Sequence, residues 1–490
     1  MEGAGYHGTS KIGKFGEQHV VYDAISEDAA LNAFHGMYGE RAFADYDFEK
    51  AELIISFGAD FLGDWQGGGY DSGYARGRVP KDGKMSKHIQ LEGNMSLSGA
   101  NADKRYPMTS TQQKIALAKL YGKLNGSTVG GGTSDEDSAE DNLVELIRKA
   151  GSKAVVVTGL KDVNAQTVVL AINKLLSSEA FDAAKPKYVR QGDTSKVRKL
   201  IADMNAGRVG ALIMDGVNPA YTLPNADDFI KGLKNVDLSV SFSFNNDETA
   251  QNSKYVAAAS HYLESWGDVE LKKGHYSLTQ PAIRELFDTR QFQTSLLNWI
   301  GADRTYYDYI RETWDTKILR GASWNKTLQD GVFVSSETPV EGDIEVGNAM
   351  AAATEETEEV AQPSLGSIAS AVRSLVSSTS AGTELLLYSK IGMGDGKQAT
   401  NPWLQEFPDP ISRVSWDNYL TVSKADASEW GLENENVANG GLDGSYVKLT
   451  VDGTVIENVP VIIQPGQAKG TVGLSYGYGR KAGMKTATNI

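Results

Sequence analysis

Three short apolar runs, each leading to a glycine, constrain the fold of this 490-residue chain most. They lie at residues 51–60 (AELIISFGAD), 153–159 (KAVVVTG) and 210–219 (GALIMDGVNP). A continuous apolar run suits a strand buried on both faces, and the glycine permits a tight exit into the next element. Because a helical stretch at 164–176 follows the second run, the pattern predicts an α/β fold with two doubly wound parallel sheets. Ligand sites in such sheets lie at the carboxyl ends of the strands.

The chain is too long for a single core, since domains typically span about 100–200 residues. An acidic stretch at 351–364 (AAATEETEEVAQPS) has no apolar period and reads as a linker. Beyond it, short strands separated by Asp-Gly and Pro-Gly turns predict a small β-barrel. We therefore predict four parts: an α/β domain at 1–150, a second at 151–350, an acidic linker with a helix at 351–383, and a barrel at 384–490.

Composition excludes several classes of function. The formal net charge is −15, which opposes nonspecific binding to a nucleic acid backbone. The chain has no cysteine, which excludes disulfides, thiolate nucleophiles and cysteine-ligated iron–sulfur clusters within it. No apolar run is long enough to span a membrane, and the first 16 residues lack the profile of a secretory signal.

Single motifs name no reaction. The six histidines have no metal-ligand spacing, no Gly-x-Ser-x-Gly elbow is present, and the glycine-rich loop at 392–397 leads into no helix that could cradle a phosphate. An aromatic and basic cluster follows the first apolar run, and either ligand binding or plain packing would explain it. This cluster consists of Trp65, Tyr70, Tyr74, Arg76 and Arg78.

An ordered set of segments is more specific than any one motif. It comprises residues 53–64 (LIISFGADFLGD), 88–105 (HIQLEGNMSLSGANADKR), 214–221 (MDGVNPAY), 247–251 (DETAQ) and 261–268 (HYLESWGD). Together these segments resemble the molybdopterin oxidoreductase superfamily. The last of them, with FGADFLG and NPWLQEFPDP at 401–410, is similar to the B subunit of bacterial alternative complex III, a quinol-oxidising respiratory assembly.

This resemblance implies two α/β domains and a C-terminal double-psi β-barrel. In active members, strand-end loops and barrel clasp pterin dinucleotides that carry molybdenum or tungsten. In the alternative complex III branch, the corresponding half of the B subunit is cofactor-free and the other half carries iron–sulfur clusters. The resemblance therefore implies no catalytic or metal-binding residue here, only positions of a vestigial pocket. These positions are Gly58, Asp60, Glu92, Thr111, Asn218 and Glu248.

Two departures favour the cofactor-free branch. Active members have Asp-Pro where this chain has Glu92-Gly93, and Pro-Gly-Thr-Asp near 109–113 (TSTQQ). The implied role is structural, and the chain reads as a fragment or one chain of a split subunit. The implied partners are an iron–sulfur half, c-type cytochrome subunits with haem c and a quinol-binding membrane subunit. The implied location is peripheral, on the periplasmic face of the bacterial inner membrane.

Two rival hypotheses stay open. The chain could be an active molybdopterin-dependent oxidoreductase in which Asp23 or Ser26 places an oxygen ligand on molybdenum or tungsten. Alternatively, it could be a soluble binding protein whose two α/β lobes enclose a ligand cleft.

Overall fold

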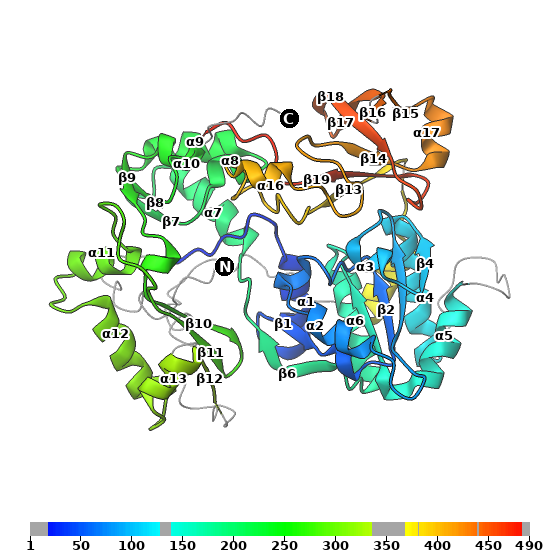
Figure 1. Cartoon of the computed structure of the whole chain (residues 1–490), viewed down its shortest axis with the longest axis horizontal. Coiled ribbons are helices and arrows are strands. Elements are labelled where there is room, and N and C mark those ends of the chain that lie inside the picture. The colour runs from blue at the N-terminus through cyan, green and yellow to red at the C-terminus, as the bar shows by residue number, and fades with distance from the viewer. Residues whose placement is uncertain (1–17, 128–138, 336–367, 381, 439–440, 483–490) are drawn as a thin grey trace. The chain divides into compact units, whose positions relative to one another are not determined.

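The computed structural model describes residues 18–127, 139–335, 368–380, 382–438 and 441–482 (Figure 1). The chain divides into two compact units. The larger unit comprises Glu27–Ala183 and Gly366–Ile490, and the smaller unit comprises Met1–Ser26 and Ala184–Leu365. The acidic stretch at 351–364 lies outside the described residues. Among the described helices, none has the length and apolar character needed to cross a bilayer.

A four-stranded parallel sheet forms the centre of the α/β domain in the larger unit (Figure 1). Its order is β4 (Lys104–Pro107), β3 (Lys87–Glu92), β2 (Leu53–Phe57) and β5 (Ala154–Thr158). Every residue of β2 and β5 is buried, as expected for strands covered on both faces. The strand order reverses between β2 and β5, which makes this pair a topological switch point.

Helices cover this sheet, and a small strand, β1 (Phe43–Tyr46), lies in the same unit. The helices are α1 (Asp28–Tyr38), α2 (Asp71–Gly77), α3 (Leu97–Ala100), α4 (Ser110–Asn125), α5 (Ala139–Ala150), α6 (Val163–Leu176) and α15 (Ile368–Val376). The predicted boundary at 150 differs from the structure, because β5 pairs in parallel with β2 and the domain continues to Ala183. The helix placed in the linker packs on the core of this domain through Ala371 and Leu375.

The smaller unit contains a second parallel sheet in the order β7 (Ala211–Asp215), β8 (Leu238–Ser243) and β9 (Tyr255–Ala258). Its helices are α7 (Thr194–Asn205), α8 (Pro219–Thr222), α9 (Ala226–Asn235), α10 (Glu248–Asn252), α11 (Phe292–Trp299), α12 (Tyr306–Thr313) and α13 (Trp324–Asp330). An antiparallel ribbon, β10 (Gly267–Lys272), β11 (His275–Thr279) and β12 (Val332–Val334), packs around buried Trp314. The chain passes between units within β6 (Phe181–Lys187).

The C-terminal part of the larger unit is a mixed sheet. Its order is β13 (Glu384–Tyr388), β19 (Thr471–Ser475), β14 (Leu420–Val422), β18 (Thr454–Ile463) and β17 (Tyr446–Val451). Beside it lie α16 (Pro402–Glu406), α17 (Lys424–Trp430), β15 (Asn434–Asn436) and β16 (Leu442–Gly444). At the predicted turn between β17 and β18, Asp452 and Gly453 both have positive φ, as a two-residue hairpin requires. The predicted fold class, with two parallel sheets and a separate C-terminal β-region, is confirmed.

Candidate functional site

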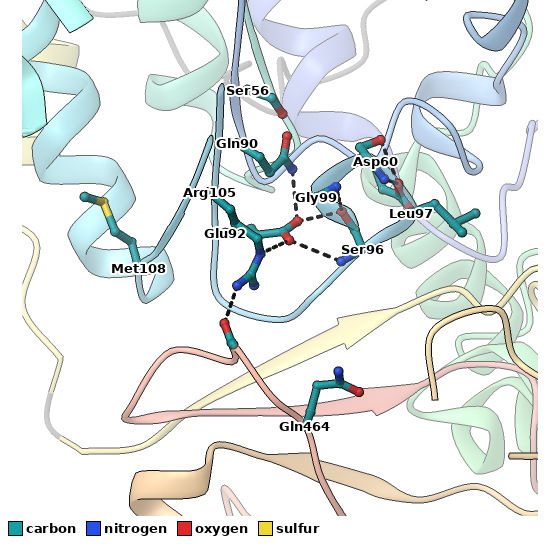
Figure 2. A network of polar contacts seen from close by, with 12 residues as sticks. Ser56, Asp60, Gln90, Glu92, Ser96, Leu97, Gly99, Arg105, Met108 and Gln464 are labelled. Carbon is teal, nitrogen blue, oxygen red and sulfur yellow. Dashed lines mark hydrogen bonds and ion pairs between the residues drawn. The ribbon is translucent and has the colours of Figure 1, made fainter. Parts of the chain in front are cut away.

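The carboxylate of Glu92, the last residue of β3, is the centre of a buried polar network (Figure 2). It accepts hydrogen bonds from Gln90 Nε2 at 3.0 Å, from Ser96 Oγ at 2.6 Å and from Ser96 N at 3.2 Å. Arg105 Nε donates to it at 2.5 Å and forms an ion pair. The carboxylate therefore accepts four hydrogen bonds, all of them from groups of its own chain.

Arg105 connects this network to the C-terminal β-region. Its side chain is 12% exposed and that of Glu92 is 4% exposed, so the ion pair is largely removed from water. Parallel pairing of β3 with β4 places Arg105 beside Gln90, within reach of the carboxylate. A second guanidinium nitrogen donates to the carbonyl oxygen of Gly466, in the loop before β19 (Figure 2). One arginine thus joins two parts of the unit that are far apart in sequence.

Asp60 also accepts hydrogen bonds from the first turn of α3. Its carboxylate accepts from Ser98 N at 2.9 Å and from Ser98 Oγ at 2.8 Å. Burial raises the pKa of Asp60, although these hydrogen bonds act in the opposite direction. Since Ser96 N donates to Glu92, two backbone N–H groups at the start of α3 point at carboxylates of the same domain.

The start of α4 is occupied in the same manner. Thr111 N, in the first turn, faces the carboxylate of Glu384 on β13 at 3.2 and 3.4 Å from its two oxygens. The positive end of a helix favours an anion at this position. The starts of α3 and α4, at this edge of the sheet, therefore each have an anion supplied by the chain itself.

The loop that follows β3 lies directly against the C-terminal β-region. Ala468 N donates to Gly93 O at 2.8 Å. A Cβ atom on Gly93 would lie 3.0 Å from Thr471 Cγ2, and one on Gly473 would lie 2.8 Å from Asn94 Nδ2. Asn94 is buried. A side chain at Gly473 would have to displace Asn94, and one at Gly93 would require Thr471 to shift, so the two surfaces are in close contact here.

A row of buried polar side chains on β3 extends from this network into the domain. His88, Gln90 and Glu92 alternate along the strand and share one face. His88 Nε2 lies 3.0 Å from Gln90 Oε1. Nδ1 lies 3.2 Å from Tyr74 Oη. Burial lowers the pKa of His88 to about 4, so the imidazole is neutral at pH 7.

The aromatic cluster after β2 is part of the core. Trp65, Tyr70 and Tyr74 are buried, and Trp65 Nε1 donates to Thr158 O at 2.9 Å. Both arginines of the cluster pair with carboxylates of the same domain, Arg76 with Glu49 and Arg78 with Asp103. Of the two readings of this cluster, the structure favours packing.

The structure brings together some predicted pocket positions of each unit. In the larger unit, Asp60 and Glu92 flank α3, and Gly58, at φ +70°, lies at the end of β2. In the smaller unit, Asn218 Nδ2 donates to Glu248 Oε2 at 2.8 Å. The two candidate oxygen ligands contact neighbouring backbone or hydroxyl groups: Asp23 Oδ2 accepts from Gly192 N at 2.7 Å, and Ser26 Oγ lies 3.3 Å from Thr194 Oγ1. The described residues contain no group of three or more His, Asp or Glu arranged for a metal ion.

Sequence reasoning missed Arg105, Ser96 and Ser98 as members of the network. The available signal was the alternation of polar residues along β3, since His88, Gln90 and Glu92 would be unusual on a fully buried strand unless they had partners.

Lys390, which was also missed, lies buried beyond the end of β13. Its Nζ donates to Tyr478 Oη at 3.1 Å and is 3.4 Å from Asp417 O. The same nitrogen lies 3.8 Å from the ring centroid of Tyr419 and 4.8 Å from that of Tyr478. Burial lowers the pKa of Lys390 to about 8, although the charges of Asp409 and Asp417 act in the opposite direction.

This lysine predicts a pH dependence of stability. Because its pKa is lower in the folded than in the unfolded chain, folding favours the neutral amine, and the free energy of unfolding should rise as pH increases above 8. Between about pH 8 and pH 10 the rise should be about 2 kcal/mol. Lys390→Met should abolish it and should be the more stable protein at pH 7.

Urea unfolding across this pH range measures the effect. Lys448→Met is the matched control, because Lys448 lies on β17 of the same β-region and is exposed. Its profile should follow that of the wild type. A Lys390→Met profile that also follows the wild type would show that the amine is not held in a desolvated site.

Comparisons with known proteins agree with this architecture. No family model matches the chain. It is 24% identical over 359 residues to the menaquinone reductase, molybdopterin-binding-like subunit of Nitratidesulfovibrio vulgaris strain Hildenborough. The aligned region covers 63% of this chain and 52% of that protein. The chain thus spans about half the length of this curated relative. Acetylene hydratase from Pelobacter acetylenicus has a similar structure, with a TM-score of 0.55 and 12% identity over 91% of this chain and 73% of that one. The chain is therefore similar in sequence to a molybdopterin-binding-like subunit and similar in fold to acetylene hydratase.

Proposed function

We propose that this chain is a cofactor-free, non-catalytic subunit of a quinone-linked respiratory complex of the alternative complex III type. Its role would be to hold the electron-carrying parts of the complex in place. The name of the curated relative, a subunit of a menaquinone reductase, supports a place in such a complex. The segments that resemble the B subunit of alternative complex III support the particular type.

The observation that carries this proposal is the occupation of the helix starts at the strand ends. A pterin dinucleotide is anionic through its pyrophosphate, and α/β folds bind such groups with free N–H donors at helix N-termini. Here the donors of α3 face Glu92 and Asp60, and the donor of α4 faces Glu384. These carboxylates would repel a pyrophosphate.

The close packing of the loop after β3 supports the same conclusion. A dinucleotide at this place would have to separate Gly93 from Ala468 and break the contact of Arg105 with Gly466. Arg105, the cation nearest the network centre, is already paired with Glu92. The residues at this junction in the larger unit therefore do not fit the cofactor of the active relatives.

The partners we propose follow from the resemblance. They are an iron–sulfur half, c-type cytochrome subunits that carry haem c, and a quinol-binding membrane subunit. The complex would place this chain peripherally on the periplasmic face of the bacterial inner membrane. All electron carriers would then belong to the partners, in keeping with the absence of cysteine from this chain.

Elemental and pterin analysis of the purified chain tests the absence of a cofactor. We expect no stoichiometric molybdenum, tungsten or fluorescent pterin product. A molybdopterin enzyme purified from the same cells provides the control, because it shows that the host supplies the cofactor. Stoichiometric metal and pterin in this chain would overturn the proposal and favour the active oxidoreductase, in which Asp23→Ala should abolish metal retention.

Co-purification tests the structural role separately. A tagged full-length chain, extracted from native membranes with mild detergent, should be recovered with haem-bearing and membrane subunits. Asp23→Ala should leave this recovery unchanged. A chain recovered alone from the native host would contradict membership of a complex, whatever the cofactor analysis shows.

A further inference from the structure

Among the residues that the structure describes, one face of the parallel sheet in the smaller unit is only partly covered. The strand order β7, β8, β9 advances in one direction, and right-handed crossovers then place all connecting helices on the same face. Residues of α7 and α9 accordingly pack with Met214 of β7 in one core cluster. The opposite face must be covered by chain from elsewhere.

This opposite face is apolar. The register pairs Ile213 with Val240 and Val240 with Tyr255, so these three side chains form one row across the sheet. Leu238 and Phe242 lie on the same face of β8, two residues to either side of Val240. Parallel sheets are normally buried on both faces, and this row has the composition of a buried face.

Helix α11 covers only one end of the face. Phe292 and Trp299 of α11 contact the ring of Phe242, with centroids 5.0 and 5.9 Å apart, and Phe242 is buried. Val240, at the centre of the row, is buried, but apolar residues around it stay exposed. The exposed fractions are 40% for Ile213 in the middle of β7, and 42% and 61% for Leu238 and Tyr255 at the starts of β8 and β9. At the C-terminal end of α11 they are 55% for Trp299 and 48% for Ile300.

The size of this surface indicates what covers it. Five side chains of this kind, exposed to this extent, present roughly 500 Å² of largely apolar surface. A stable interface that stands alone buries about 800 Å² on each partner, so this face alone is too small to hold a second copy of the chain. It suits one element of a subunit that also contacts the chain elsewhere.

The geometry indicates that this element is a helix. The exposed surface is a sheet face and not a strand edge, and the layer above it already contains one helix, α11. A second helix fits beside the first at the usual spacing of about 8–10 Å. An amphipathic helix with an apolar stripe would complete the layer that the crossovers leave open.

We propose that the face formed by Ile213, Leu238 and Tyr255, beside Trp299 and Ile300 of the α11 end, is the docking site for an amphipathic helix of another subunit. The proposal rests on the proposed function for the existence of a complex, and it adds the surface and the kind of element that binds. The apolar stripe of that helix packs on the sheet, in a layer with α11.

Site-specific photo-crosslinking within the purified native complex tests this placement. Photo-reactive benzoylphenylalanine is introduced at position 213 on β7 or at position 255 on β9, and the cross-linked residues are mapped by mass spectrometry. We expect both positions to cross-link to one subunit, at residues three, four or seven apart. No cross-link, cross-links to a second copy or to lipid, or sites two residues apart as in a strand would each overturn the proposal.

A charge substitution provides an independent test. Leu238→Glu combined with Tyr255→Glu should reduce recovery of the cross-linked subunit at least tenfold, while the circular dichroism and Tm of the isolated chain stay close to those of the wild type. The matched control is Leu175→Glu, because Leu175 is 47% exposed on α6 of the larger unit. Wild-type recovery by the face variant would contradict docking here. If the wild-type chain itself forms no complex, the proposed function fails, whereas a complex with an uncovered face contradicts only this inference.

Discussion

Arg105→Ala is expected to lower the free energy of unfolding of the larger unit by about 3–5 kcal/mol, because it leaves the buried Glu92 carboxylate without its charged partner. The hydrogen bonds from Ser96 and Gln90 would remain, but they cannot neutralise the charge. The contact with Gly466 would also be lost. Urea unfolding at pH 7, followed by tryptophan fluorescence, measures the change.

An exposed ion pair in the same domain provides the control. Lys153 pairs with Glu52, and both side chains are about half exposed. Lys153→Ala should therefore change the unfolding free energy by less than about 1 kcal/mol. A double-mutant cycle with Glu92→Gln should further show coupling between Arg105 and Glu92. Equal effects of Arg105→Ala and Lys153→Ala would contradict a buried network at this junction.

The contact with Gly466 makes a further consequence measurable. Without the guanidinium, the loop before β19 loses one of its links to the α/β domain and keeps the link from Ala468 N to Gly93 O. Hydrogen exchange in this loop should therefore become faster in Arg105→Ala than in Lys153→Ala. Unchanged hydrogen exchange would show that Arg105 stabilises the α/β domain without holding the loop before β19 in place.

Local patterns predicted individual elements well. The apolar runs correspond to β2, β5 and β7, and the Asp452-Gly453 dipeptide marks the turn between β17 and β18. Each of these elements depends on only a few adjacent residues, so a local pattern can predict it. The pairing of one strand with another depends on residues far apart in sequence, and a local pattern does not predict it. For this reason β5 joins the sheet of β2 although composition suggested a domain boundary before β5.

The same difference between local patterns and long-range contacts applies to the residues of the candidate site. Glu92 could be singled out because it departs from a family pattern at one position. Arg105 could not, because its contact with Glu92 depends on the register between β3 and β4. Lys390 was hidden for a related reason, since it precedes a glycine-rich loop that resembles exposed sequence. Its burial depends on Tyr419 and Tyr478, both distant along the chain.

The second large effect is expected at Gly159, which follows β5 at the switch point of the first sheet. A Cβ atom there would lie 2.1 Å from Gly58 O and 3.0 Å from Ala59 Cα. Both neighbours are backbone atoms, so no side chain can rotate away and β2 and β5 would have to separate at their carboxyl ends. Gly159→Ala should therefore lower the free energy of unfolding by about 4 kcal/mol or more.

Gly210→Ala is the matched control, because Gly210 precedes β7 of the second sheet and a Cβ atom there would meet nothing within 4 Å. We expect it to stay within about 0.5 kcal/mol of the wild type. If Gly159→Ala is too unstable to purify, its soluble yield at low and high growth temperature, compared with that of Gly210→Ala, provides the measurement. Because Gly58 O belongs to the strand end that leads to Asp60, a tolerated Gly159→Ala would show that the ends of β2 and β5 do not approach this closely. The same result would weaken the case that this edge of the sheet is closed to a cofactor.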